Sequence, residues 1–256
     1  MRYYKGYITL SDVFDIPILL HIRNARAIFL EQLRELFSLE GNEMAVRSLR
    51  WRLARMQKAG LIQRLSNQRH LGRPVWGITQ TGLASLESRG HTLLSLTSAA
   101  QQILDPSQIP HALELVNIHL ALMRGGILRT WKTDLEIASR NLVLDGLATK
   151  DFDAIAEIDV NGNSHCCGIE YERSPKSPSR YRAIREVLDR DQTVDTVLYL
   201  TADDDIMYLL ALEMRGARKR IGFALSGSFR ESLLETRTLT NTPNSDVVLL
   251  RDLIGT

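Results

Sequence analysis

The spacing of apolar and polar residues predicts helices in the first third of the chain. Residues 15–24, 30–41 and 42–60 each carry apolar residues at the spacing of an amphipathic helix. The first is expected to be capped by Asp15 with a proline in its first turn, and the others to close at Gly41 and Gly60. Three consecutive helices are therefore predicted.

The third predicted helix has two different faces at 100° per residue. The apolar stripe consists of Val46, Leu49, Leu53 and Met56. The opposite face consists of Arg47, Trp51, Ala54 and Lys58, flanked by Arg50 and Arg55. The stripe is expected to pack and the cationic face to point outward.

Two short strands are predicted at 61–65 and 75–79, around a turn rich in Asn, Gly and Pro, and residues 81–90 predict a closing helix. Three helices followed by a basic hairpin is the order of a winged helix-turn-helix, whose third helix enters the DNA major groove. The alternative is a solvated basic helix on another fold.

The predicted DNA-binding residues lie on the third helix and in the hairpin turn. They are Arg47, Arg50, Trp51, Arg55, Lys58, Arg69, His70 and Arg73. Arg47 and Arg50 are assigned to base reading, because arginine to guanine is the commonest specific contact. Arg69 and Arg73 are assigned to phosphates, while Trp51 either touches DNA or packs against the hairpin.

Charge divides the chain in the same place. Residues 1–96 carry 14 Lys and Arg against 7 Asp and Glu, a net charge of +7, while the remainder carries 18 against 23, a net charge of −5. A basic front and an acidic back predict two domains, the first with an anionic partner. We expect a winged helix-turn-helix over 1–96, a linker over 97–110 and a second domain over 111–256.

Two adjacent cysteines, Cys166 and Cys167, do not make a disulfide framework, which favours a reducing, cytoplasmic location. The N-terminus lacks a signal-peptide core, and no apolar run approaches the length of a membrane span. The chain is therefore expected to have no membrane partner.

The second domain contains a predicted hairpin. A helix is expected over 111–126 and a strand near Trp131, followed by two alternating runs around Asn161-Gly162, a strong turn signal. This turn pairs Val160 with Asn163 and places Asp153 opposite Glu170 and Asp151 opposite Glu172. One face is then a core, formed by Phe152, Ala154, Ala156, Ile158 and Val160 opposite Tyr171, Ile169 and Cys167.

The other face of this hairpin is acidic. It consists of Asp151, Asp153, Glu157 and Asp159 opposite Glu172, Glu170 and Cys166. Like charges across strands repel, so the set requires water, cations or a metal, and oxygen ligands suit Mg²⁺ or Mn²⁺. Asp153 and Glu170 are the candidate metal ligands.

The stretches "KDFDA" and "GIEYER", with a helix and a strand predicted over 177–201, are similar to the core of PD-(D/E)XK nucleases. The resemblance implies an α/β/α domain with a mixed sheet, in which Asp153 and Glu170 hold metal and a lysine acts on the attacking water. Here the lysine position is Glu172, and Lys176 follows four residues later. Glu114 stands where some members supply another glutamate. The catalytic candidates are Asp153, Glu170, Glu172 and Lys176.

The order of the whole chain resembles the replication-relaxation family of plasmids and mobile elements, through "LRWRLARMQKAGLIQRL", the helix opening at His111, and "DFDAIAEI…GIEYERSPKSPSRY". The resemblance implies double-stranded DNA binding in transcription control, replication or DNA relaxation. The nuclease-like domain, without its lysine, is expected to be non-catalytic and to serve dimerisation, partner contact or DNA clamping. The alternatives are a metal-dependent DNA endonuclease or nickase, and an interaction module for an acidic protein.

Overall fold

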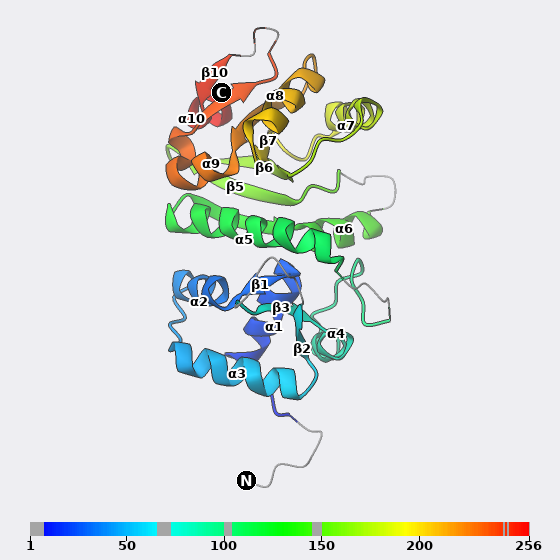
Figure 1. The fold of residues 1–256 in the computed structure, drawn as a ribbon, viewed down its shortest axis with the longest axis vertical. Helices are drawn as coiled ribbons and strands as arrows, with labels where there is room; N and C mark the ends of the chain where they lie inside the picture. Colours follow the sequence, from blue (N-terminus) through cyan, green and yellow to red (C-terminus); the bar gives the residue numbers. More distant parts are fainter. Residues whose placement is uncertain are drawn as a thin grey trace. The chain divides into compact units, whose positions relative to one another are not determined.

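The computed structural model describes residues 8–65, 73–99, 104–144, 150–242, 244 and 246–255. These residues form an α/β protein that divides into two compact units, Met1–Val116 and Asn117–Thr256 (Figure 1). None of the helices in the described ranges has both the length and the apolar character needed to cross a bilayer.

The first unit combines helices with a small antiparallel sheet of strand order β1-β3-β2. In chain order its elements are α1 (Asp15–Ala25), β1 (Ile28–Phe29), α2 (Leu30–Leu39), α3 (Val46–Lys58), β2 (Ile62–Leu65), β3 (Val75–Ile78) and α4 (Gln80–Glu87). The three predicted helices, the strand pair and the closing helix are confirmed. The short strand β1 was not predicted.

The ends of α2 and α3 follow from local chemistry. Gly41 and Gly60 have φ of 78° and 73°, the left-handed conformation that glycine adopts without a steric penalty. The predicted cap of α1 is wrong, because Phe14 occupies the cap position and Asp15 is the first helical residue. The carboxylate of Asp15 accepts a hydrogen bond from the backbone N–H of Ser11 at 2.9 Å, and it also binds Arg52 and Arg55.

The core of the first unit forms where the apolar faces of α1, α2 and α3 pack together. Its fully buried members include Ile18, Leu19 and Ile22 of α1, Leu33 and Phe37 of α2, and Leu49, Leu53 and Met56 of α3. The predicted packing stripe of α3 is therefore confirmed, with Val46 half-buried at its start. Burying this stripe leaves the opposite side of α3 in solvent.

The boundary between the two compact units lies inside a helix. A 3-10 turn (Pro106–Gln108) leads directly into α5 (Ile109–Arg124), and the units divide between Val116 and Asn117. The first turns of α5 belong to the first unit because Ile109, Ala112 and Leu113 pack against Ala27 and Val75. Composition alone could not locate this packing.

The second unit is organised around a mixed seven-stranded sheet of order β10-β9-β8-β7-β6-β5-β4. Its elements are β4 (Leu128–Thr133), α6 (Asp134–Val143), β5 (Ala154–Val160), β6 (Asn163–Glu172), α7 (Pro178–Arg190), β7 (Thr196–Thr201), α8 (Asp204–Glu213), β8 (Arg220–Leu225), α9 (Ser226–Ser232), a 3-10 turn (Leu233–Glu235), β9 (Arg237–Thr240), β10 (Val247–Leu249) and α10 (Leu250–Gly255). Strands β6, β7 and β8 are parallel and the other pairs antiparallel. The predicted α/β class with a mixed sheet is confirmed.

Helices cover both faces of this sheet. On one face α7 and α8 pack on β7 and β8 through a cluster that includes Tyr181, Leu188, Leu210, Val197 and Phe223. On the other face Leu253 of α10 lies over Gly222. A Cβ atom at position 222 would come within 2.4 Å of the Leu253 side chain. Glycine at position 222 therefore allows the close approach of this helix.

The predicted hairpin register is confirmed over seven residue pairs, from Ala154 opposite Ile169 to Val160 opposite Asn163. Asn161 and Gly162 both have positive φ, 55° and 86°, as a tight two-residue turn requires. The predicted core face is buried from Ala154 to Val160.

The pairing ends at Ala154, one residue short of the predicted acidic pairs. The sequence pattern predicted that Phe152 lies on the same face of the hairpin as Ala154, and this prediction is wrong. The Phe152 ring packs against Gly168, which pairs with Ile155, on the opposite face of the sheet from Ala154. A Cβ atom at position 168 would lie only 2.7 Å from this ring. The reason is that residues 150–153 leave the ladder, so the two-residue alternation stops before Phe152.

Candidate functional site

The exposed face of α3 carries the predicted DNA-contacting residues. Arg47, Arg50 and Lys58 are exposed, and Trp51 keeps 54% of its surface exposed. None of these three cations forms an ion pair with another residue of the described part of the chain. Three cationic groups and an indole are thus presented together to solvent.

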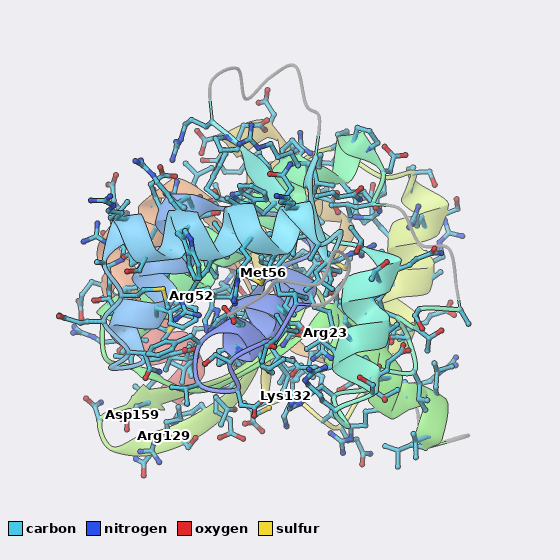
Figure 2. All side chains as sticks on the ribbon, turned by 90° about the horizontal axis from the view of Figure 1, so that it is seen from below. Arg23, Arg52, Met56, Arg129, Lys132 and Asp159 are labelled. Atoms are coloured by element: carbon cyan, nitrogen blue, oxygen red, sulfur yellow. The ribbon has the colours of Figure 1, made fainter. Side chains whose placement is uncertain are left out.

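Beneath this face, a buried carboxylate links α1 to α3. Asp15 is fully buried, and it accepts hydrogen bonds from Arg52 Nη1 at 2.7 Å and from Arg55 Nη2. Figure 2 shows Arg52 and Met56 extending from α3 toward the interior of the first unit. This cluster was not predicted, because its partners are 37 and 40 residues apart in the sequence.

The Asp15 cluster changes the role of Arg55. The sequence placed Arg55 among the DNA contacts, but its guanidinium is paired with Asp15 and lies 4.8 Å from the centroid of the Trp51 ring. Arg52 lies 4.7 Å from the Phe14 centroid and 6.0 Å from that of Trp51. Two arginines therefore border Trp51 on its α1 side.

The hairpin turn is only partly within the described residues. Arg69 and His70 lie outside them. Arg73 is exposed, with Nη2 at 3.2 Å from Glu31 Oε2 and its guanidinium 4.4 Å from the Phe29 centroid. Since both members of the Arg73–Glu31 pair are exposed, the pair is weak and leaves Arg73 available to a stronger anion.

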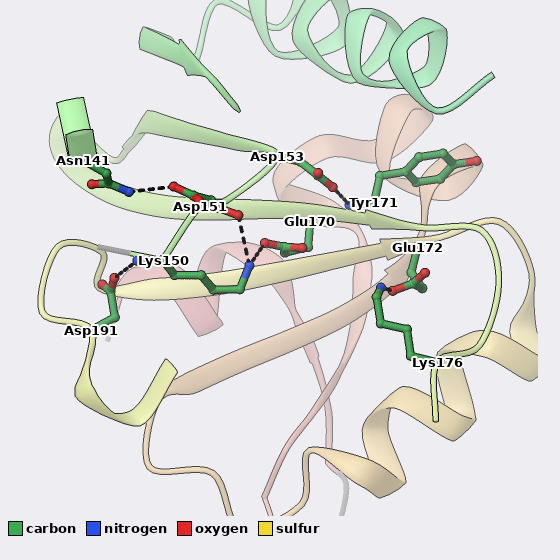
Figure 3. A network of polar contacts seen from close by, with 9 residues as sticks. All are labelled: Asn141, Lys150, Asp151, Asp153, Glu170, Tyr171, Glu172, Lys176 and Asp191. Atoms are coloured by element: carbon green, nitrogen blue, oxygen red, sulfur yellow. Dashed lines mark hydrogen bonds and ion pairs between the residues drawn. The ribbon is translucent and has the colours of Figure 1, made fainter. Parts of the chain in front are cut away.

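In the second unit, each glutamate of the predicted catalytic set has a lysine partner. Glu170 Oε1 is paired with Lys150 Nζ, and Glu172 Oε2 with Lys176 Nζ. Asp153 does not face Glu170 across a ladder. Its carboxylate accepts the Tyr171 backbone N–H at 2.8 Å (Figure 3). The predicted like-charge repulsion is thus relieved by two ammonium groups.

Lys150 was missed by the sequence analysis. It lies four residues before the first residue of β5, its backbone N–H donates to Asp191 at 3.1 Å, and its ammonium is 4.6 Å from the centroid of Phe152. A continued strand would have carried it away from Glu170. The departure of residues 150–153 from the ladder instead brings its side chain back across the sheet (Figure 3).

The same electrostatic environment changes several pKa values. Burial, and secondly the charge of Asp153, raises the pKa of Glu170 to about 7, against the opposing effect of Lys150. Burial lowers the pKa of Lys176, while Glu170 and Asp153 oppose that change. The buried Tyr199 hydroxyl has no hydrogen-bond partner among the described residues, and burial followed by Glu170 raises its pKa. The charge of Glu170 thus affects the pKa values of both Lys176 and Tyr199.

Asp159 and Asp151, two further acidic residues of the predicted acidic face, also have partners. Arg129 of the neighbouring strand β4 donates from Nε to Asp159 at 3.1 Å, and both residues are labelled in Figure 2. These hydrogen bonds hold the pKa of Asp159 below its usual value. Asn141 of α6 donates to Asp151 at 2.7 Å.

The donor set for a divalent metal is not assembled by these residues. Within the described ranges, no three His, Cys, Asp or Glu side chains come together in a way that could hold an ion. Glu114, the additional metal candidate, belongs to the first unit, whereas Asp153 and Glu170 belong to the second. One carboxylate oxygen of Glu170 is paired with Lys150, and one of Glu172 with Lys176.

The two sites define a class: a two-unit α/β protein with a cationic, tryptophan-bearing helix face in one unit and a lysine-neutralised acidic hairpin in the other. Comparison with known proteins adds nothing to this description, since no protein-family model, no curated protein and no solved structure matches the chain.

Proposed function

We propose that this chain is a cytoplasmic, sequence-specific protein that binds double-stranded DNA through α3. The observation that carries the proposal is the solvent-facing set of Arg47, Arg50, Trp51 and Lys58 on one helix face. An α-helix fits the major groove, where arginine forms paired hydrogen bonds with guanine. Arg47, Arg50 and Lys58 have no carboxylate partner in the part of the chain that the structure describes, so their charge is available to the nucleic acid.

The element order supports a winged helix-turn-helix for the first unit. Three helices precede a hairpin, and a short strand before α2 joins that hairpin in the order β1-β3-β2. In such a fold α3 is the recognition helix and the residues between β2 and β3 follow the DNA backbone. Arg69, His70 and Arg73 belong to this connection.

The connectivity of the second unit supports a nuclease-like fold. Helix α5, three antiparallel strands β4, β5 and β6, helix α7 and the parallel strand β7 follow one another in the chain, with α6 inserted after β4. This is the order expected for the PD-(D/E)XK core. Together with the first unit, it supports a role as transcriptional regulator or replication and relaxation accessory of a plasmid or mobile element.

Single substitutions on α3 test the DNA-binding proposal. Arg47→Ala and Arg50→Ala are each expected to cost about 1–3 kcal/mol of binding free energy and to relax the preference at one base position. Arg73→Ala is expected to weaken all duplexes about equally, as a phosphate contact does. The measurement is fluorescence anisotropy on a selected duplex and on duplexes with single base changes.

Arg89→Ala provides the matched control, because Arg89 is an exposed arginine of the same unit placed just after α4. It is expected to leave binding unchanged. If Arg47→Ala, Arg50→Ala and Arg73→Ala reduced the affinity for every duplex by the same factor, α3 would not be the reading element. Binding to an acidic protein but to no duplex would favour the interaction-module alternative.

A second candidate function, metal-dependent cleavage of DNA, is favoured by one observation. The ammonium group of Lys176 is paired with Glu172, and the charges of Glu170 and Asp153 act on it, which supports Lys176 as a stand-in for the missing lysine. We nevertheless propose that the site is non-catalytic. Glu172 places a negative charge at the position where the resemblance expects a lysine, and charge that develops on the phosphate needs stabilising cations. One oxygen each of Glu170 and Glu172 is in addition paired with a lysine.

Incubation with supercoiled plasmid and Mg²⁺ or Mn²⁺ is therefore expected to give no nicking above that of the Asp153→Ala and Glu170→Ala proteins. The variants control for contaminating nuclease. Nicking by the wild type that disappears in both variants, while DNA binding is kept, would establish the enzyme instead.

A further inference from the structure

We propose that Trp51 reads the C5-methyl group of a thymine, and that Arg55, held by Asp15, positions the indole for this contact. The inference rests on the proposed function, because it names what the α3 face recognises in DNA. It assigns Arg55 to positioning and Trp51 to sequence recognition.

Trp51 occupies the point of α3 farthest from the core. At 100° per residue it lies opposite the buried stripe of Leu49, Leu53 and Met56. Its exposed fraction is 54%, whereas that of Trp76 in the same unit is 4%. An indole at this position contributes little to the core, so its apolar surface is available to a ligand.

The indole is nevertheless not free to take any orientation. The Arg55 guanidinium lies 4.8 Å from its centroid, a distance typical of a cation–π contact. Arg55 is in turn fixed by the carboxylate of Asp15, which is fully buried and also binds Arg52. A side chain whose rotamer is set before binding loses less entropy when it binds.

The division of charge on α3 leaves a specific recognition set. Arg52 and Arg55 are engaged by Asp15, so the exposed arginines beside the indole are Arg47 and Arg50. Arg47 lies four residues before Trp51 on the same face of the helix, and Arg50 flanks that face. Arginine selects guanine, and the thymine methyl is the apolar group that the major groove presents. The face therefore fits a thymine close to one or two guanines.

The experiment begins with a duplex selected by the wild-type protein from a random-sequence library. Each thymine is then replaced singly by deoxyuridine, which removes only the methyl group. At one position the wild-type affinity is expected to fall about fourfold, the equivalent of one buried methyl group. The Trp51→Ala protein is expected to bind the thymine and uracil duplexes equally.

Arg55→Gln tests the positioning role, because it keeps Trp51 and leaves Asp15 its hydrogen bonds with Arg52 and Ser11. The ratio of affinities for the thymine and uracil duplexes is expected to fall toward one. A purely structural role of Arg55 would instead lower both affinities by the same factor and leave the ratio unchanged. Circular dichroism confirms that the variant is folded.

The outcomes separate this inference from the proposed function. Duplex binding in which no uracil replacement reduces the affinity would overturn the thymine contact and leave DNA binding intact. The same holds if the uracil effect persists in Trp51→Ala, or if Trp51→Ala weakens every sequence equally, which would place the indole on the DNA backbone. If no duplex is bound at any salt concentration, the proposed function itself fails.

Discussion

Raising the salt concentration from 50 to 200 mM is expected to weaken duplex DNA binding roughly a hundredfold if four phosphates are neutralised. Each neutralised phosphate releases condensed counterions, so the logarithm of the affinity falls linearly with the logarithm of the salt concentration. The first 96 residues carry a net charge of +7. Arg47, Arg50 and Lys58 are exposed without a carboxylate partner among the described residues.

The salt titration has an internal control in the second unit. Arg182 is an exposed arginine of α7, and Arg182→Ala is expected to leave the slope unchanged. Lys58→Ala is expected to reduce the slope of log affinity against log salt concentration by about one unit, the contribution of one phosphate contact. An affinity that does not respond to salt, or a slope reduced by Arg182→Ala and not by Lys58→Ala, would contradict binding through α3.

Asp15→Ala is expected to lower the free energy of unfolding by about 3–5 kcal/mol, the cost of removing one partner from a buried ion pair. Asp15 is fully buried, and its removal leaves Arg52 and Arg55 half-buried without their counterion. The Ser11 N–H would lose its acceptor as well. The measurement is urea-induced unfolding followed by circular dichroism.

Glu31→Ala provides the matched comparison. It removes an acidic residue that pairs with an arginine of the same unit, but both partners are exposed. An exposed ion pair contributes about 0–1 kcal/mol, so the expected loss is small. Equal losses for Asp15→Ala and Glu31→Ala would mean that the Asp15 cluster does not join α1 to α3.

Local patterns were sufficient for the elements that carry the candidate sites. The period of α3 separated the buried Leu49 from the exposed Arg47 and Arg50. The Asn161-Gly162 turn predicted the register of β5 and β6 residue by residue. Both signals are local, since a helical face depends on residues three or four apart and a tight turn depends on two residues with positive φ.

The sequence pattern failed where the chain leaves a regular element. Extending the hairpin alternation to Phe152 and Asp153 assumed a strand that in fact begins at Ala154. The consequence is chemical as well as geometric. Asp153 accepts the backbone N–H of Tyr171, and Lys150 pairs with Glu170.

The sequence by itself thus determined the helices and the strand pair of the first unit, the cationic face of α3 and the register of the β5–β6 hairpin. Only the tertiary structure decided which charges are available. Asp15 engages Arg52 and Arg55, while Lys150 and Lys176 engage Glu170 and Glu172. The physical reason is that a buried charge needs a partner from whichever element packs against it. Packing between residues distant in the sequence leaves no periodic signal along the chain.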